Sequence, residues 1–169
     1  MEYLNLLNWE NIDVSEGRRN LGEEMPVAVY RLMQYAIHDE LAERYSLQEA
    51  QNIIRNSGRR VGILFCNRLI NQALPLNEFI SELQRLLKEF KIGVLRVEQS
   101  DPANGKFVLT VAEDLDCSGL PLLNETVCHY DEGFIAGILE EYTGKKFQVI
   151  EIDCWATGDR VCRFKAEAI

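Results

Sequence analysis

The chain has 169 residues, of which 47% are hydrophobic and 27% are charged, a composition typical of one soluble globular domain with a buried core. Its formal net charge of -9 argues against a nucleic-acid-binding surface, because such a surface needs basic groups that neutralise phosphates. No apolar run predicts a membrane span, and the first residues lack the basic and apolar regions of a secretory signal. We therefore expect a cytoplasmic protein, whose five cysteines are thiols or metal ligands rather than a disulfide framework.

The N-terminal part is expected to comprise a segment over residues 1–16, followed by a single domain over residues 17–169. Glycine and asparagine within residues 17–22 predict a turn, since both residue types tolerate positive φ. A first helix begins near Pro26, and apolar residues then recur at three- and four-residue steps as far as Leu41. This stripe either packs in the core or forms a helix-to-helix dimer contact, and we favour the core.

A second helix, expected to reach about residue 72, opens at a capping box formed by Ser46 and Glu49. Gly58 and Gly62 lie four residues apart on one face of this helix. They would let another backbone approach closely, and a kink is the alternative.

A third helix is expected over about residues 77–90, after which the period of the pattern changes. Two β-rich segments, residues 92–99 and 106–113, are separated by a strong turn signal at residues 101–105 and therefore predict a hairpin. A loop over residues 114–123 follows the hairpin.

A fourth helix is expected to begin near Asp131 and Glu132, because negative charge favours a helix N-terminus, and to end at the C-cap Gly144. Residues 147–153 and 160–166 are then expected to be strands joined by a tight turn. The fold class is therefore α+β, with N-terminal helices packed with a four- to five-stranded antiparallel sheet.

Four residues of the C-terminal third could form one metal site: Cys128, Glu151, Cys154 and Cys162. A three-residue loop at residues 157–159 would place Cys154 opposite Cys162, with their Cβ atoms about 4.5–5.5 Å apart. Residues three apart in a regular strand point to opposite faces, so Glu151 and Cys154 converge only if the strand bulges near Ile152 and Asp153. Cys128 would arrive from the start of the fourth helix.

Three thiolates and one carboxylate complete the four-coordinate geometry of structural zinc and leave no position for a catalytic water. Thiolate ligands favour zinc over magnesium or calcium. A disulfide between Cys154 and Cys162, or merely buried thiols, is the alternative, and the spacing alone does not decide between them. Cys66 is expected to be a small buried hydrophobe, and no role is assigned to Cys117 or His129.

Three motifs in this region, at residues 126–128, 133–137 and 151–164, resemble the vinyl-4-reductase (4VR) domain family, as does the segment at residues 19–26. The family includes stand-alone proteins of the hydrocarbon-binding type and the sensor domains of aromatic-responsive transcription activators. The resemblance covers residues 17–167. It implies a fold shared with the ligand-binding domains of NO-signalling haem proteins and Golgi-transport (TRAPP) subunits, and a homodimer formed through the N-terminal helices.

The resemblance also implies the ligands of the metal. In the aromatic sensors zinc is held by three cysteines and a glutamate, whose spacing matches Cys128, Glu151, Cys154 and Cys162 here. The sensors bind a phenol-type molecule with a histidine and a tryptophan. No equivalents can be placed among the histidines and tryptophans of this chain, which are His38, His129, Trp9 and Trp155.

We therefore expect a domain that binds or senses a small apolar or aromatic molecule. The candidate pocket residues, each of which could equally be plain core, are Phe107, Leu109, Phe134, Val149 and Trp155. One alternative is a reductase-type or accessory enzyme acting on a tetrapyrrole vinyl group, and another is a ligand-free scaffold subunit. The sequence has no nicotinamide or flavin fingerprint, no Gly-rich phosphate loop and no nucleophile with a nearby base, so an enzyme is less favoured.

Overall fold

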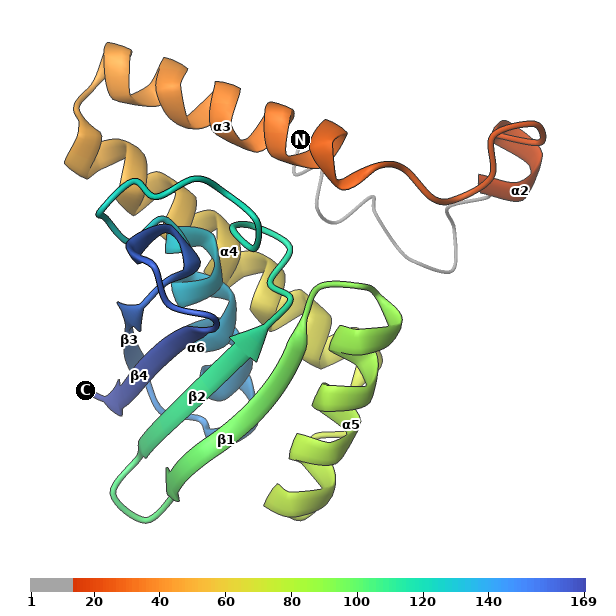
Figure 1. Ribbon diagram of the computed structural model, residues 1–169. Coiled ribbons are helices and arrows are strands. Elements are labelled where there is room, and N and C mark those ends of the chain that lie inside the picture. Colours follow the sequence, from red (N-terminus) through yellow and green to blue (C-terminus); the bar gives the residue numbers. More distant parts are fainter. Residues whose placement is uncertain (1–13) are drawn as a thin grey trace. The chain divides into compact units, whose positions relative to one another are not determined.

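The computed structural model describes residues 14–169, so Trp9 and most of the expected N-terminal segment lie outside the described residues. Its internal contacts divide the chain into two compact units, residues 1–35 and 36–169. The described part of the first unit contains the short helix α2 (Val14–Gly17) and the beginning of α3 (Val27–Arg44), which continues into the second unit (Figure 1). Between these helices, backbone hydrogen bonds close the predicted turn that ends at Gly22.

Helix α3 buries none of its residues. The expectation that its apolar stripe packs in the core is therefore wrong for this single chain. Leu32 is 73% exposed, and Val29 and Met33 are each more than half exposed. The stripe has the helical period that the sequence predicts, but the period alone does not say what covers it.

The second unit contains three further helices and a four-stranded antiparallel sheet, which confirms the predicted α+β class. The strand order in the sheet is β1-β2-β4-β3. The bounds are α4 (Leu47–Leu69), α5 (Leu76–Glu89), α6 (His129–Thr143), β1 (Val94–Asp101), β2 (Lys106–Ala112), β3 (Phe147–Asp153) and β4 (Cys162–Ala168).

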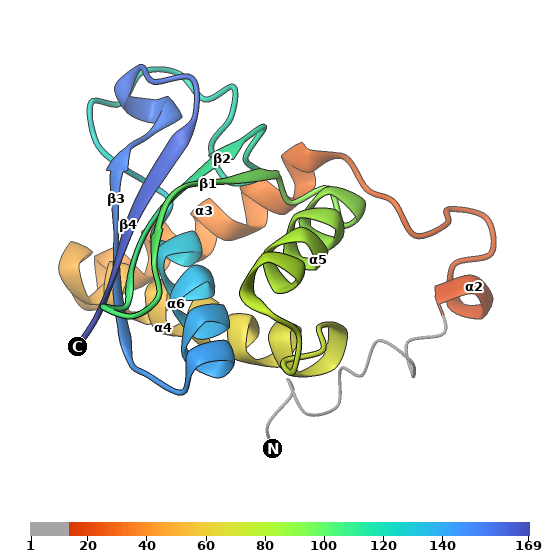
Figure 2. The ribbon, with the colours of Figure 1, turned by 90° about the horizontal axis from the view of Figure 1, so that it is seen from below.

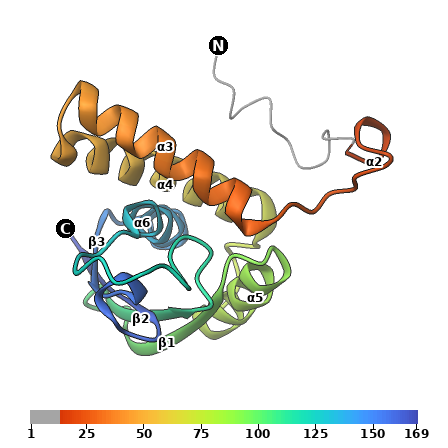
Figure 3. The ribbon, with the colours of Figure 1, turned by 45° about the horizontal axis from the view of Figure 1, so that its top comes forward.

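Helix α6 lies between α4 and the sheet (Figure 3). Helix α5 lies beside it and packs on β1, so that α5, α6 and the β1–β2 hairpin enclose part of the core (Figure 2). Ten consecutive residues of α6, from Asp131 to Glu140, are buried. A helix buried on all sides in this way is the central element of the unit.

Four glycines allow α4 and α6 to cross at very short range. A Cβ atom added at Gly133 would lie 1.8 Å from the carbonyl oxygen of Arg55, and one added at Gly62 would lie 2.1 Å from that of Phe134. Gly58 and Gly137 are blocked in the same way by backbone atoms of the opposite helix. The predicted close approach of a second backbone to α4 is therefore confirmed.

Strand β3 carries a bulge where the sequence requires one. The pairing between β3 and β4 shifts register between Glu151 and Asp153, which confirms the predicted irregularity. Beyond the shift, Asp153 pairs with Arg163. The same register, continued by one residue, sets Cys154 opposite Cys162.

The predicted three-residue turn between the last two strands is wrong. Residues Trp155–Thr157 form a 3-10 turn, and β4 begins only at Cys162, two residues later than expected. The hydroxyl of Thr157 holds this longer connection, since it accepts a hydrogen bond from the Cys154 N–H and donates one to the Cys154 carbonyl. Gly158 follows with a φ of 106°, a conformation that favours glycine.

Candidate metal centre and adjoining cavity

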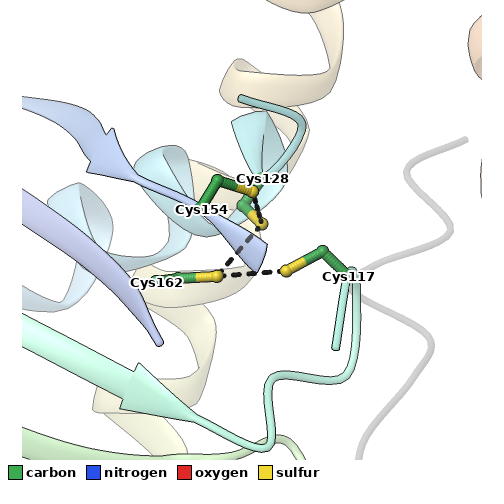
Figure 4. Close-up of side chains that lie close together, drawn as sticks. All are labelled: Cys117, Cys128, Cys154 and Cys162. Atoms are coloured by element: carbon green, nitrogen blue, oxygen red, sulfur yellow. Dashed lines mark hydrogen bonds between the residues drawn. The ribbon is translucent and has the colours of Figure 1, made fainter. Parts of the chain in front are cut away.

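Four cysteine side chains converge at one end of the sheet, and none is solvent-exposed. The Sγ atoms of Cys117, Cys128, Cys154 and Cys162 all lie within 4.8 Å of one another (Figure 4). Each comes from a different segment: the loop after β2, the N-cap of α6, the end of β3 and the first residue of β4. All are free thiols, so the alternative of a Cys154–Cys162 disulfide is not realised in this structure.

Local hydrogen bonds explain how the loops deliver these side chains. The Oδ1 atom of Asp114 accepts hydrogen bonds from the backbone N–H groups of Asp116 (2.8 Å) and Cys117 (3.1 Å), which turns the loop inward at Cys117. The 3-10 turn does the same for Cys154, whose carbonyl oxygen accepts from the Asp159 N–H at 3.1 Å.

The sulfur separations suit a four-coordinate ion. The Cys128 Sγ lies 3.9 Å from the Cys154 Sγ and 3.8 Å from the Cys162 Sγ. Ligands at the usual Zn–S distance of about 2.3 Å in a tetrahedron are about 3.8 Å apart. The Cys117 and Cys162 sulfurs are closer, at 3.0 Å, so one of them would move outward to bind such an ion.

Glu151 lies beside this cluster but is not one of its four groups. Its Oε2 accepts a hydrogen bond from the Cys128 N–H at 3.0 Å. Its Oε1 is buried and has no hydrogen-bond partner among the described residues. Burial, together with the nearby Cys154, raises the pKa of the carboxyl to about 8. Glu151 is therefore placed to support Cys128, and its second oxygen is available to a ligand.

Three of the four predicted metal ligands are thus brought together, and the fourth thiol comes from Cys117, to which the sequence analysis assigned no role. Cys117 lies in an irregular loop, so no spacing rule connects it to the other cysteines. The one local signal is Asp114, three residues earlier, which can cap a tight turn.

Electrostatics favour a cation at this position. The thiol of Cys117 and the other two cysteines, through their hydrogen bonds, hold the pKa of Cys128 well above its usual range and lower that of Cys154. The protein alone therefore stabilises one thiolate rather than four. Burial and Asp116 also raise the pKa of Asp114 to about 7. Buried acids and thiols in this number are costly to ionise unless a positive ion lies among them.

Glu132 anchors the first turn of α6 to both of its neighbours. Its Oε1 accepts from the Glu151 N–H at 2.8 Å, and its Oε2 lies 2.7 Å from the Arg55 guanidinium of α4. The His129 Nδ1 lies 3.4 Å from the same oxygen. His129 therefore faces a carboxylate and takes part in this anchor.

A small apolar cavity adjoins the metal centre. It has a volume of about 30 Å³ and lies between α5, the β1–β2 hairpin and α6. Of the five predicted pocket residues, Leu109 and Phe134 line it. Phe107 and Val149 are core residues, and the Trp155 Nε1 donates to the Leu120 carbonyl at 3.0 Å in the loops. None of the helices in residues 14–169 is long and apolar enough to cross a membrane.

Comparison with known proteins relates this region to one family. Residues 107–168, which include all four cysteines of the cluster, match the model of the vinyl-4-reductase (4VR) domain. The uncharacterized protein MJ1642 of Methanocaldococcus jannaschii is 32% identical over 88 residues, which span 52% of each chain. MJ0150 of the same organism is 25% identical over 146 residues, 86% of this chain and 78% of that one. The chain thus matches only about half the length of MJ1642.

Solved structures share the fold at low sequence identity. A vinyl-4-reductase family protein from Methanocaldococcus jannaschii aligns with a TM-score of 0.62 at 19% identity, over 93% of both chains. The phenol-responsive sensory domain of the transcription activator PoxR, solved with phenol, aligns with a TM-score of 0.65 at 13% identity, over 88% of this chain and 78% of its own.

Two further structures confirm the broader fold prediction. A trafficking protein particle complex subunit 3 from Naegleria fowleri, covalently bound to palmitic acid, aligns with a TM-score of 0.66 at 10% identity, over 85% of this chain and 95% of its own. An H-NOX protein from S. oneidensis aligns with a TM-score of 0.55 at 14% identity, over 87% of this chain and 78% of its own.

Proposed function

We propose that this chain, whose residues 107–168 match the 4VR domain, binds or senses a small apolar molecule and is stabilised by a structural zinc ion. The observation that carries the proposal is the convergence of four buried thiols next to an apolar cavity. A cluster of thiols without an open ligand position suits a structural metal better than a hydrolytic one.

Zinc is the metal that this donor set favours, because thiolates are soft ligands and magnesium and calcium prefer oxygen. The residues that would hold it are Cys128, Cys154 and Cys162, with Cys117 as the fourth donor. Glu151, the ligand expected from the family resemblance, lies beside Cys128 and is the competing fourth donor. When bound, zinc would contribute folding free energy by joining α6, the β3–β4 connection and the loop after β2.

The cavity between α5, the hairpin and α6 is the proposed ligand site. Its walls are largely leucine, isoleucine, valine and phenylalanine side chains, which suit an apolar molecule. Two proteins of the same fold were solved with molecules that carry apolar groups, phenol in the PoxR domain and palmitic acid in the trafficking subunit. They support the class of ligand and do not identify it.

We also propose that α3 forms a homodimer contact. Its stripe of exposed apolar residues is typical of a helix that packs against a second copy, and α3 buries nothing within its own chain. The cytoplasmic location remains a prediction.

Native mass spectrometry of the purified full-length chain tests the proposal. We expect a dimer that carries one zinc ion per chain, and denaturing extraction is expected to release a small apolar molecule. A zinc-free protein that folds normally would refute the structural metal. A bound flavin or tetrapyrrole would favour the enzyme alternative, and a protein that takes up no small molecule would favour a scaffold.

A further inference from the structure

One polar residue interrupts the apolar lining of the cavity. The walls come from α5, from Ile92 and β1, from β2 and from α6, and Asp131 is the single residue among them that is not a hydrocarbon side chain. It projects from the first turn of α6, one helical turn after Cys128. An apolar pocket with one convergent polar group is the usual composition of a small-molecule site.

Asp131 is buried without its full set of hydrogen bonds. The residue is 8% exposed, and its Oδ2 has no hydrogen-bond partner among the described residues. A buried acceptor that lacks a donor destabilises a fold, whereas leucine at this position would complete the apolar wall. The carboxyl group is therefore better explained by a partner that is not part of the described chain.

Water is a poor candidate for that partner. A buried water requires roughly 10–15 Å³ of space, which the cavity of about 30 Å³ provides, but it also requires two to four polar contacts. The cavity lining provides one polar side chain. A molecule with a single donor and an otherwise apolar surface matches the lining better than water does.

The metal centre is the competing partner. A carboxylate oxygen of Asp131 lies within 4.8 Å of the Cys128 sulfur and of an Asp114 oxygen. However, four thiols already provide a complete tetrahedral donor set, so an additional carboxylate is not needed there.

We infer that Asp131 is the recognition residue of the cavity, and that the ligand is a small molecule with an apolar body and one hydroxyl or amino hydrogen-bond donor. This inference rests on the proposed binding function and specifies its ligand class. The donor hydrogen-bonds to the Asp131 carboxyl group, while the body contacts Leu83, Leu109 and Ile135 from α5, β2 and α6.

Two isomeric probes test the inference, butan-1-ol, which has a donor, and diethyl ether, which has none. Each is titrated into the full-length, zinc-loaded protein while the methyl resonances of the cavity leucines and isoleucines are followed by NMR. We expect the wild type to bind butan-1-ol about tenfold or more tightly than the ether, because a hydrogen bond to a charged group contributes that much or more. In Asp131→Asn the preference is expected to fall to about threefold or less, because an amide can donate to the ether oxygen.

Asp116→Asn is the matched control, since Asp116 is a buried carboxyl nearby that does not line the cavity, and it is expected to keep the wild-type preference. Equal binding of both probes to the wild type, or a preference that survives in Asp131→Asn, would overturn the inference but leave a binding module. Unshifted cavity methyls with either probe would overturn it as well. Loss of zinc in Asp131→Asn would assign the residue to the metal centre instead. If the wild type contains no zinc yet prefers the alcohol, the structural metal fails and the inference stands.

Discussion

Replacing Gly133 by alanine tests the close crossing of α4 and α6. The new Cβ would lie 1.8 Å from the Arg55 carbonyl oxygen, whereas an ordinary contact begins at 3.4 Å. The obstacle is backbone on both helices, so no side-chain rotation relieves it, and the helices must separate over a largely buried interface. Overpacking of this kind costs about 3 kcal/mol or more, of which the better helix propensity of alanine returns about 1 kcal/mol.

We therefore expect Gly133→Ala to lower the free energy of unfolding by about 2 kcal/mol or more, which corresponds to a fall in Tm of roughly 5–10 °C. The measurement is thermal unfolding followed by circular dichroism at a fixed zinc concentration, since bound metal shifts the apparent stability. Gly62→Ala, on the opposite helix, should behave in the same way, because its Cβ would lie 2.1 Å from the Phe134 carbonyl. Gly17→Ala is the control, since a Cβ there meets nothing within 4 Å. If Gly133→Ala and Gly17→Ala unfold at the same temperature, the close crossing is refuted.

Three other predictions concern the metal, the first turn of α6 and the dimer. Cys154→Ser should abolish stoichiometric zinc by elemental analysis, whereas Cys66→Ser, which changes a buried cysteine outside the cluster, should retain it; one zinc per chain in Cys154→Ser would contradict the site. Burial raises the pKa of Glu132, but hydrogen bonds from His129 and the Glu151 N–H and the charge of Arg55 lower it further, so the net shift is downward. Its stabilisation is therefore present above the unfolded pKa and lost as the pH falls through the folded value, and Glu132→Gln should reduce the loss of stability measured in acid. Leu32→Lys on α3 should halve the mass seen by sedimentation without changing zinc content, and an unchanged dimer would exclude this face of α3.

Much of the fold follows from periodicity that the sequence displays openly. The capping box at Ser46, the glycine spacing of α4 and the change to strands after α5 each depend on neighbours in the chain, and each is found in the structure. The bulge in β3 was predictable because two side chains three residues apart had to converge.

The failures have a common physical cause, which is that the deciding contact is distant or belongs to an irregular loop. The turn before β4 is lengthened by the side chain of Thr157, and its hydrogen bonds to Cys154 have no distinctive pattern in the sequence. Cys117 joins the other thiols only after Asp114 has folded its loop. The stripe on α3 has the period of a core helix, but its covering surface is not encoded within the stripe itself.

The first turn of α6 connects the features of this domain, because neighbouring residues there face different partners. Cys128 faces the thiol cluster, Asp131 the cavity, Glu132 the α4 and β3 backbones, and Gly133 the crossing with α4. A rise of about 1.5 Å per residue keeps Cys128 and Asp131 within about 5 Å along one rigid helix. The helix is buried from Asp131 onward and blocked by backbone at Gly133, so it cannot shift at one site without shifting at the other. A metal that fixes Cys128 therefore also fixes the position from which Asp131 would meet a ligand.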